Sequence, residues 1–295
     1  MTVLRADLRS VTFVTLDLLN RCFAPMSEII FRHRGRIDKF TGDSLLVLFE
    51  SEDSPVDGVR RAVSCAVDVQ QAMAHLNAEN KAKGLTPLYF GIGINTGRVL
   101  STKLGSDLYS EYAGIGDEVN LASRIESFSL RGQVLLSESA FRRCGGYVKA
   151  GEPMDVFVKG KSKLVALREV VGIPSLMKVV PQQDARRSPR SGASIPFSYR
   201  MMVNGVAVPE SRRGTLIDIG YHGALAEIEL AISPASKLQL RFDLPLVSER
   251  FHDVSGQAVK VMKKKDRTRV GIEFRRMTAQ QKAAIQRFVQ LLIQP

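Results

Sequence analysis

The sequence predicts an α+β fold in two parts: a central sheet with helices packed on it, followed by a small β-barrel with a C-terminal helix. Over about the first 170 residues, apolar strands alternate with amphipathic helices, the pattern of a layered structure. In the remainder, short strands follow one another and a capping box then opens a final helix. A stretch with Pro174 and Pro181 separates the two patterns. We therefore expect domains at 1–172 and 186–295, joined by a linker at 173–185.

The first strand of the predicted sheet, Val3 to Leu8, carries an acidic residue, Asp7, near its end. A second acid, Asp43, lies on a Gly-containing turn within the segment 35–50, GRIDKFTGDSLLVLFE. Carboxylates on rigid elements at strand ends suit Mg²⁺, a hard cation that takes oxygen ligands. The pair therefore indicates a dication site of a nucleotide enzyme. The alternative is an ordinary hairpin whose aspartate suits the turn.

Two amphipathic helices are predicted to pack on this sheet. The first spans residues 11–34, where apolar residues recur every three to four positions until Gly35. The second opens at Ser54, a helix cap followed by proline, and runs to Gly84. A strand follows at 88–95, where apolar residues alternate with glycine and polar residues. These elements would supply the core of the first domain.

The segment 111–126, EYAGIGDEVNLASRIE, predicts a helix that starts near Asp117 after two glycines. Asn120 and Arg124 are four residues apart, so their side chains share one face of this helix. An amide and a guanidinium placed in this way could contact the same group, and the arginine could stabilise negative charge on phosphoryl oxygens in a transition state. The alternative is a surface pair beside a helix start.

Composition narrows the class of protein. No run of about 18 apolar residues is present, so we expect neither a membrane span nor a secretory signal, and a cytosolic location. The three cysteines, Cys22, Cys65 and Cys144, have no metal-ligand spacing, and we expect core thiols. The net charge is +12, and residues 176–295 hold 20 Lys and Arg against 10 Asp and Glu. Such a basic half suggests an anionic partner, or simply a basic soluble surface.

The segments IDKFTGDSLLVLF, GIGINTG, IGDEVNLASRIE and FVKGKSKL resemble, in wording and order, the catalytic domain of class III nucleotide cyclases. The resemblance implies a ferredoxin-like domain that acts as a homodimer, with two Mg²⁺ or Mn²⁺ ions at each active site. One subunit would give the metal acids and the other the nucleotide-binding residues. The implied reaction converts ATP to 3′,5′-cyclic AMP and pyrophosphate.

The same resemblance assigns roles to individual residues. These are the metal ligands Asp7, Leu8 and Asp43, the ribose and phosphate residues Asn120 and Arg124, the triphosphate lysine Lys159, and the purine-binding positions Lys39 and Ala113. Lys39 stands where adenylate cyclases keep lysine and guanylate cyclases usually have an acid, which favours ATP over GTP. Ala113 departs from the family, which has Asp or Thr there, because its side chain cannot accept a hydrogen bond from adenine.

The segment after Asp7 is also several residues shorter than in the family. Two other functions therefore stay open. One is a guanylate cyclase. The other is a catalytically degenerate cyclase fold that serves as a dimerisation scaffold for the second domain.

The second part of the chain carries R-x-x-x-R and D-x-G-x-x-G motifs and resembles a PilZ domain, a small barrel that typically binds cyclic di-GMP. The implied ligand residues are Arg186, Arg187, Arg190, Asp218, Gly220 and Gly223. Arginine suits this ligand because its planar fork pairs with phosphates and guanine edges. The family usually has serine where Gly220 stands, so a docking module without ligand is the alternative. The basic run at 263–267 has no interleaved aromatic residues, so we interpret it as a hairpin turn and expect no nucleic-acid partner.

Overall fold

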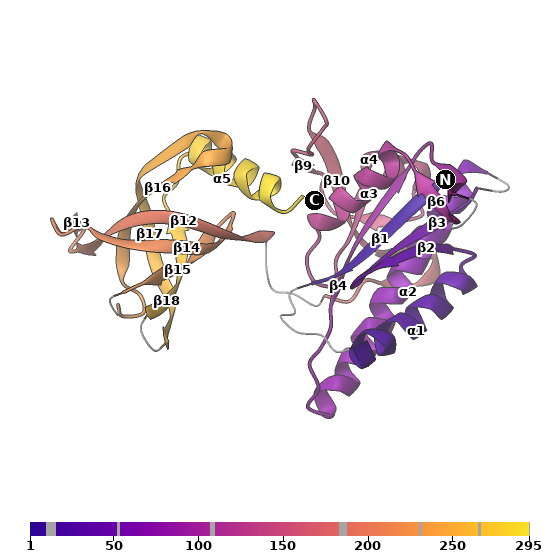
Figure 1. Ribbon diagram of the computed structural model, residues 1–295, viewed down its shortest axis with the longest axis horizontal. Coiled ribbons are helices and arrows are strands. Elements are labelled where there is room, and N and C mark those ends of the chain that lie inside the picture. The colour runs from indigo at the N-terminus through magenta and orange to yellow at the C-terminus, as the bar shows by residue number, and fades with distance from the viewer. Residues whose placement is uncertain are drawn as a thin grey trace. The chain divides into compact units, whose positions relative to one another are not determined.

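Figure 1 shows the protein as a computed structural model, which describes residues 1–9, 16–51, 54–106, 110–182, 188–229, 232–264 and 267–294. The chain divides into two compact units, Met1–Arg186 and Arg187–Gln294, and each contains its own hydrophobic core. The shortened segment after Asp7 lies largely outside the described residues. So do two of the predicted ligand arginines, Arg186 and Arg187.

The first unit is built on a central mixed sheet, as the sequence predicts. Its strands are β1 (Thr2–Leu8), β2 (Arg36–Thr41), β3 (Ser44–Phe49), β4 (Phe90–Thr96), β7 (Val134–Ser137), β8 (Lys149–Ala150), β9 (Met154–Val156), β10 (Val165–Ile173) and β11 (Lys178–Val179). The order across the sheet is β11-β10-β7-β4-β1-β3-β2, and β8 and β9 pair with β10. β5 (Leu100–Gly105) and β6 (Ser110–Ile115) form a separate hairpin.

Helices cover both faces of this sheet (Figure 1). α1 (Leu16–Arg32), α2 (Pro55–Ala82) and α4 (Glu138–Cys144) pack on one face, and α3 (Asp117–Ser127) packs on the other. Along β1 the side chains alternate, because Leu4 and Ala6 join the core under α1 and α2 whereas Val3 joins the smaller cluster under α3. By the same alternation Asp7 lies on the α3 face.

Local signals explain where the first helices begin and end. Ser54 caps α2, and its hydroxyl accepts hydrogen bonds from the backbone N–H groups of Val56 and Asp57, each at 3.3 Å. The chain turns after α1 at Gly35, where a Cβ would lie 2.8 Å from the ring of Phe49. Glycine is therefore required by the close approach of β3. Both predicted helices are confirmed, and α1 is described from Leu16 onward.

Residues 173–180, the first part of the predicted linker, are folded onto the sheet. The short turn η1 (Pro174–Leu176) redirects the chain so that β11 pairs with the end of β10. Lys178 forms an ion pair of 2.5 Å with Asp68 of α2, which also contacts His33 at 2.9 Å. Val180 is buried in the core. The prolines therefore mark a turn within the first unit, because partners distant in sequence hold the segment.

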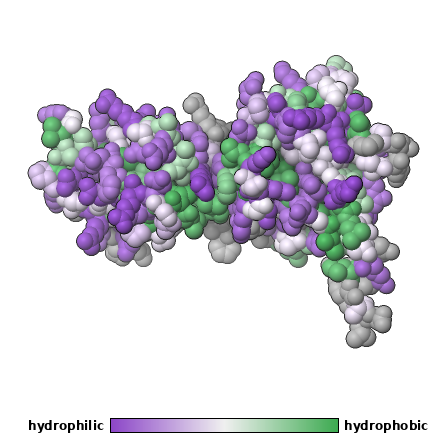
Figure 2. Space-filling view, turned by 90° about the horizontal axis from the view of Figure 1, so that it is seen from above, coloured by the Kyte–Doolittle hydropathy of each residue, from purple (hydrophilic) through white to green (hydrophobic). Residues whose placement is uncertain are grey.

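The second unit is a closed antiparallel barrel with a helix, which confirms the predicted fold. Its six barrel strands, in order around the barrel, are β12 (Arg190–Val203), β14 (Arg212–Gly220), β15 (Gly223–Ile228), β18 (Arg267–Arg275), β17 (Glu249–Lys264) and β16 (Lys237–Leu244). Pairing of β16 with β12 closes the barrel. The short β13 (Val206–Ala207) extends β12, and the turn η2 (Pro245–Val247) follows β16. Hydrophilic side chains prevail on the face of this unit that Figure 2 shows.

The final helix, α5 (Ala279–Leu292), begins at the predicted capping box. The Thr278 hydroxyl accepts from the Gln281 N–H at 3.1 Å, and the Gln281 side chain accepts from the Thr278 N–H at 3.0 Å. Main-chain pairing of β14 with β12 and β15 extends to Gly220, so the motif residue Asp218 lies inside this strand. Lys264 pairs with Arg267, which confirms the hairpin at the basic run.

All three cysteines are buried, as predicted. Burial raises the pKa of Cys22 and of Cys144 to about 11, and it raises that of Cys65 further. These thiols therefore belong to the core. In the described part of the chain, no helix combines the length and the apolar character needed to cross a membrane.

Candidate functional site

Asp7 and Asp43, which the sequence pairs as metal ligands, lie side by side at one end of the central strands. Asp7 is opposite Ser44 in the ladder of β1 and β3, and Asp43 directly precedes Ser44 in the turn after β2. Gly42 in this turn has a φ of 61°, which glycine adopts without strain. Asp43 is exposed and Asp7 is half-buried. Burial raises the pKa of Asp7; the Arg9 guanidinium opposes this shift and the charge of Asp43 adds to it.

The residues that follow Asp7 connect this end of β1 to the rest of the unit. Leu8 packs its side chain into the core under α1 and α2, so only its backbone could supply an oxygen ligand. The Arg9 side chain forms an ion pair with the buried Glu126 of α3 and lies 3.3 Å from the hydroxyl of Ser129. Burial raises the pKa of Glu126 to about 8, although Arg9 acts in the opposite direction. Arg9 thus ties the end of β1 to α3.

The two predicted purine-binding positions are brought together by neighbouring strands. Lys39 is half-buried on β2, where the pairing register shifts between Ile37 and Lys39. Asp38 lies at this irregularity with its side chain fully buried, and its Oδ1 accepts a hydrogen bond from the N–H of Gly114 at 3.1 Å. Gly114 directly follows Ala113, which is buried on β6. Asp38 therefore holds the strand of Lys39 against the strand of Ala113.

The predicted ribose and phosphate residues form a second group around α3. Asn120 is exposed and Arg124 is half-buried, one helical turn further along. The Arg124 Nη1 donates a hydrogen bond to the backbone carbonyl of Lys159 at 2.6 Å. Lys159 is exposed in the loop between β9 and β10. The structure thus brings Arg124 and Lys159 together, with Asn120 on the same helix.

The start of α3 lies near the opposite end of the sheet from the acids. Glu118, two residues before Asn120, accepts a hydrogen bond through its backbone carbonyl from the side-chain amide of Asn95 at 3.0 Å. Asn95 is opposite Val3, four residues before Asp7 on β1. Four residues of strand span roughly 13 Å.

The two groups are also separated across the sheet. Arg124 reaches the loop before β10, whereas Asp43 belongs to the β2–β3 hairpin. The strands β7, β4 and β1 lie between β10 and β3 in the sheet. Within the described part of one chain, Arg124 forms no ion pair with Asp7 or Asp43, although Arg9, two residues after Asp7, pairs with Glu126 of the same helix.

In the second unit, the described residues of the two PilZ-like motifs form one cluster. The Arg190 Nε donates to the Asp218 Oδ1 at 2.6 Å. Arg190 is opposite Gly220, and a Cβ at 220 would lie 2.6 Å from the Arg190 Cγ, so the glycine makes room for the arginine. A Cβ at Gly223 would lie 2.3 Å from the carbonyl oxygen of Ile272, which leaves no space for a side chain there.

Sequence reasoning did not identify Asp38 or the pair of Arg9 and Glu126. For each of the two acids, Asp38 and Glu126, the sequence contains a local signal that could have identified it. Asp38 is an acid inside a strand pattern, and Glu126 lies next to the inward Ile125 of an amphipathic helix. Their partners are distant in sequence, so spacing alone could not reveal them.

A cyclase domain followed by a PilZ barrel is the class of protein that this fold and these residues define. Residues 6–167 match the family model described as the adenylate and guanylate cyclase catalytic domain, and residues 184–291 match the model of the PilZ domain. The chain therefore belongs to the class III nucleotide cyclases, whose catalytic domains generally use two divalent metal ions, and it carries a PilZ domain after the cyclase domain.

Two curated relatives are named adenylate cyclases. Adenylate cyclase 1 of Rhizobium meliloti is 29% identical over 158 residues, which cover 53% of this chain and 24% of that protein. The adenylate cyclase of Anabaena cylindrica is 30% identical over 187 residues, which cover 58% of this chain and 36% of that protein. The chain thus spans a minor part of the length of both relatives.

Solved structures with a similar fold include a guanylyl cyclase and an adenylyl cyclase. The guanylyl cyclase Cya2 is 35% identical with a TM-score of 0.57, and the match covers 61% of this chain and 96% of that one. The adenylyl cyclase CyaB from P. aeruginosa is 32% identical with a TM-score of 0.54, and the match covers 64% of this chain and 95% of that one.

Proposed function

We propose that the first unit is an adenylate cyclase that forms 3′,5′-cyclic AMP and pyrophosphate from ATP at the interface between two copies of the chain. The observation that carries this proposal is that, within the described part of one chain, the Arg124 side chain bonds to the Lys159 carbonyl and pairs with neither acid. In a head-to-tail pair, Asp7 and Asp43 of one copy would face Asn120 and Arg124 of the other. The curated relatives named adenylate cyclases support the choice of product.

The acid pair suits a divalent metal. Asp7 and Asp43 are neighbouring oxygen donors, and the charge of Asp43 disfavours ionisation of Asp7 when no cation is present. A dication between them would remove that repulsion, and Mg²⁺ and Mn²⁺ prefer oxygen ligands. The chemistry that such ions supply is positive charge, which neutralises the triphosphate and lowers the pKa of the ribose 3′ hydroxyl.

The residues of the chain itself would position the nucleotide. The Arg124 guanidinium has one nitrogen fixed by the Lys159 carbonyl, so its plane is oriented before substrate arrives. Its remaining N–H groups would stabilise the negative charge that develops on the phosphoryl oxygens. The exposed amide of Asn120 would orient the ribose, and the Lys159 ammonium would bind the triphosphate. Attack of the 3′ hydroxyl on the α phosphorus needs no covalent intermediate, so positioning and charge provide the catalysis.

Two residues, Lys39 and Ala113, bear on whether the base of the substrate is adenine or guanine. Lys39 favours ATP, because adenylate cyclases keep lysine there. GTP is the second candidate, since the buried Ala113 offers no side-chain acceptor for the adenine amino group. The similarity to the guanylyl cyclase Cya2 is compatible with this candidate.

The test is a product assay with both nucleotides. The purified full chain is incubated with Mg²⁺ or Mn²⁺ and with ATP or GTP in parallel, and the products are separated by chromatography. Cyclic AMP as the main product supports the proposal, and cyclic GMP as the main product supports the second candidate. If neither forms although the chain dimerises in solution, the cyclase fold is a scaffold and not an enzyme.

We further propose that the Arg190 and Asp218 cluster binds cyclic di-GMP and that this binding regulates the cyclase. The side chains of Arg190 and Asp218 are 34% and 33% exposed, so an anionic ligand can reach the arginine. Calorimetry of the full chain with cyclic di-GMP tests binding. Cyclase rates with and without the ligand test regulation, and an unchanged rate at saturating ligand would contradict coupling.

A further inference from the structure

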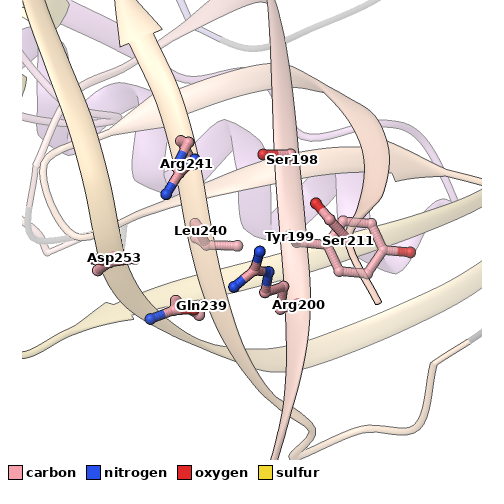
Figure 3. A pocket seen from close by; sticks show the side chains of 8 residues that line it. All are labelled: Ser198, Tyr199, Arg200, Ser211, Gln239, Leu240, Arg241 and Asp253. Atoms are coloured by element: carbon pink, nitrogen blue, oxygen red, sulfur yellow. The ribbon is translucent and has the colours of Figure 1, made fainter. Parts of the chain in front are cut away.

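Three arginines and a serine share one outward face of the barrel. Ser198 of β12 is directly opposite Arg213 of β14 on one side and Arg241 of β16 on the other. Opposite residues of antiparallel strands point to the same face, so the two guanidiniums flank the hydroxyl. Arg250 of β17 is opposite Asp243, two residues after Arg241, and is therefore a diagonal neighbour of Arg241. Figure 3 shows Arg241 and Ser198 on neighbouring strands of this face.

Among the described residues, no acidic side chain forms an ion pair with these three arginines. All three arginines are exposed, and none of their side chains takes part in an ion pair or hydrogen bond within the part of the chain that the structure describes. Several other arginines of the barrel are paired with acids, among them Arg190, Arg212 and Arg269. Like charges close together on a sheet repel each other. The grouping therefore favours the binding of an anion.

The barrel core fixes the positions of these arginines. Phe242 and Phe251 stack with ring centroids 5.0 Å apart, and Phe197 is opposite Phe242. These inward side chains set the register of β12, β16 and β17, and the register sets the spacing of the outward residues. The Cα atoms of Arg213 and Arg241 are separated by two strand spacings, about 10 Å, so both long side chains can reach one phosphate group. The site is thus built on rigid elements.

The arginines line a cleft. Its volume is about 640 Å³, within the range of small-molecule sites, and Pro196 and Pro245 give it apolar lining. His252 also lines it, and the single carboxylate in the lining is that of Asp243, so the cleft has net positive charge. A smaller depression of about 30 Å³ adjoins it and shares Ser198 and Arg241 (Figure 3).

We propose that this cleft binds a mononucleotide. Arg213, Arg241 and the Ser198 hydroxyl would hold the phosphate, because guanidinium forks pair with phosphate oxygens through charge-assisted hydrogen bonds. The flat base would lie against Pro196 and Pro245. A concave site of this size favours a small anion over a polymer, which would follow an extended positive groove.

The cleft is distinct from the Arg190 and Asp218 cluster. Asp218 is five residues after Arg213 on β14, which corresponds to roughly 17 Å along the strand. The mononucleotide could be free, or it could be one half of a cyclic dinucleotide. The shared chemistry is a phosphate attached to a flat base, and experiment separates the two sources.

The experiment is calorimetry of the full chain with AMP and with ribose 5-phosphate, which lacks the base. Wild type is compared with Arg241→Gln, Arg213→Gln and the control Lys260→Gln, which removes an exposed cation of β17 outside the cleft. AMP that binds to the cyclase unit gives the same heat in all these variants, so differences report on the cleft. Because the substituted residues are exposed, the variants should fold, and circular dichroism checks this.

Both arginine variants are expected to bind AMP about tenfold or more weakly, with Lys260→Gln unchanged. Ribose 5-phosphate should bind wild type about tenfold more weakly than AMP, since burial of the base is lost. The proposal is overturned if both arginine variants bind AMP like wild type, if Lys260→Gln weakens binding equally, or if ribose 5-phosphate binds as tightly as AMP. If Arg241→Gln also weakens binding of cyclic di-GMP, the site is supported, and the nucleotide that it binds is one half of the cyclic dinucleotide. If cyclic di-GMP binding is unchanged in that variant, the site is supported with a free mononucleotide.

Discussion

The Asp38 carboxylate accepts a hydrogen bond from the backbone N–H of Gly114 at 3.1 Å, and this contact joins β2 to β6. Asp38 directly precedes Lys39, and Gly114 directly follows Ala113. Arg36 Nη1 lies 3.7 Å from the same carboxylate oxygen, so the buried charge has a cation nearby. The other oxygen, Oδ2, has no hydrogen-bond partner among the described groups. The spacing of the two purine-binding positions thus rests on a side chain that sequence reasoning did not select.

Asp38→Ala is expected to lower kcat/KM for the preferred nucleotide about tenfold or more, mainly through KM. A hydrogen bond to a charged group contributes about 1.5–3 kcal/mol, and without it β6 is free to shift relative to Lys39. Asp38→Asn keeps an acceptor and should retain most of the activity. Steady-state kinetics with ATP and GTP measures the effect, and Asp57→Ala on α2 is the control. An unchanged KM in folded Asp38→Ala protein would contradict this role.

Asp43→Ala is expected to abolish cyclase activity without unfolding the chain. Asp43 is exposed in the β2–β3 turn and contributes nothing to the core. Product formation measures activity, and thermal unfolding followed by circular dichroism measures the fold. Retained activity in this variant would eliminate the acid pair as a metal site.

A mixture of Asp43→Ala and Arg124→Ala proteins is expected to regain part of the activity that each variant lacks alone. One of the two sites in a mixed dimer would contain intact acids from one copy and an intact Arg124 from the other. Random exchange produces half mixed dimers, each with one whole site, so about a quarter of wild-type activity is the upper limit. If subunit exchange is demonstrated by differently tagged copies and no activity returns, the site is not shared between chains.

Arg190→Ala is expected to weaken cyclic di-GMP binding about tenfold or more, because a charge-assisted hydrogen bond contributes about 1.5–3 kcal/mol. Calorimetry of the full chain measures this, and binding should weaken at high salt because the ligand is a dianion. Arg212→Ala, which removes an arginine paired with Glu210, is the matched control. Equal loss in both variants would indicate a general charge effect and not a site at Arg190.

Gly220→Ser is expected to strengthen cyclic di-GMP binding modestly, by tenfold or less, since a neutral hydroxyl contact contributes about 1 kcal/mol. The new Cβ would lie 2.6 Å from the Arg190 Cγ, so the arginine side chain, which pairs with Asp218, must shift. That movement would free Arg190 for the ligand. The same calorimetric titration measures the change, and weaker binding would show that the arginine is displaced from the site.

Asp68→Asn is expected to destabilise the first unit at pH 7 by about 1–3 kcal/mol. Burial alone would raise the pKa of Asp68, but hydrogen bonds from Lys178 and His33 outweigh it and lower the pKa below 3.8. A depressed pKa means that the stabilisation is present above pH 3.8 and is lost as the pH falls through the folded value. The difference from wild type should therefore shrink in strong acid. Urea unfolding at several pH values measures it, with Asp57→Asn as control, and a pH-independent difference would contradict the assignment.

The sequence by itself determined the elements and the family. Some signals act through neighbours within a few residues, so they can be recognised in the sequence alone. They include helix caps such as Ser54 and Thr278, alternation along strands and the turn at Gly42. The acids Asp7 and Asp43 and the helix with Asn120 and Arg124 were located for the same reason. From the sequence, residues 173–180 were predicted to be part of a linker, because prolines are local signals. The contacts that hold this segment on the sheet, with Asp68 and with the core, come from residues distant in sequence.

Only the tertiary structure decided which side chains meet. The pairing of Asp38 with Gly114, the attachment of Arg9 to Glu126 and the arginine cleft around Ser198 all join residues on different elements. The same structure put the acids and Arg124 in different places on the sheet. Cross-strand register and the packing of helices on sheet faces set these distances, and both depend on how buried side chains fit together, which residue spacing along the chain does not encode.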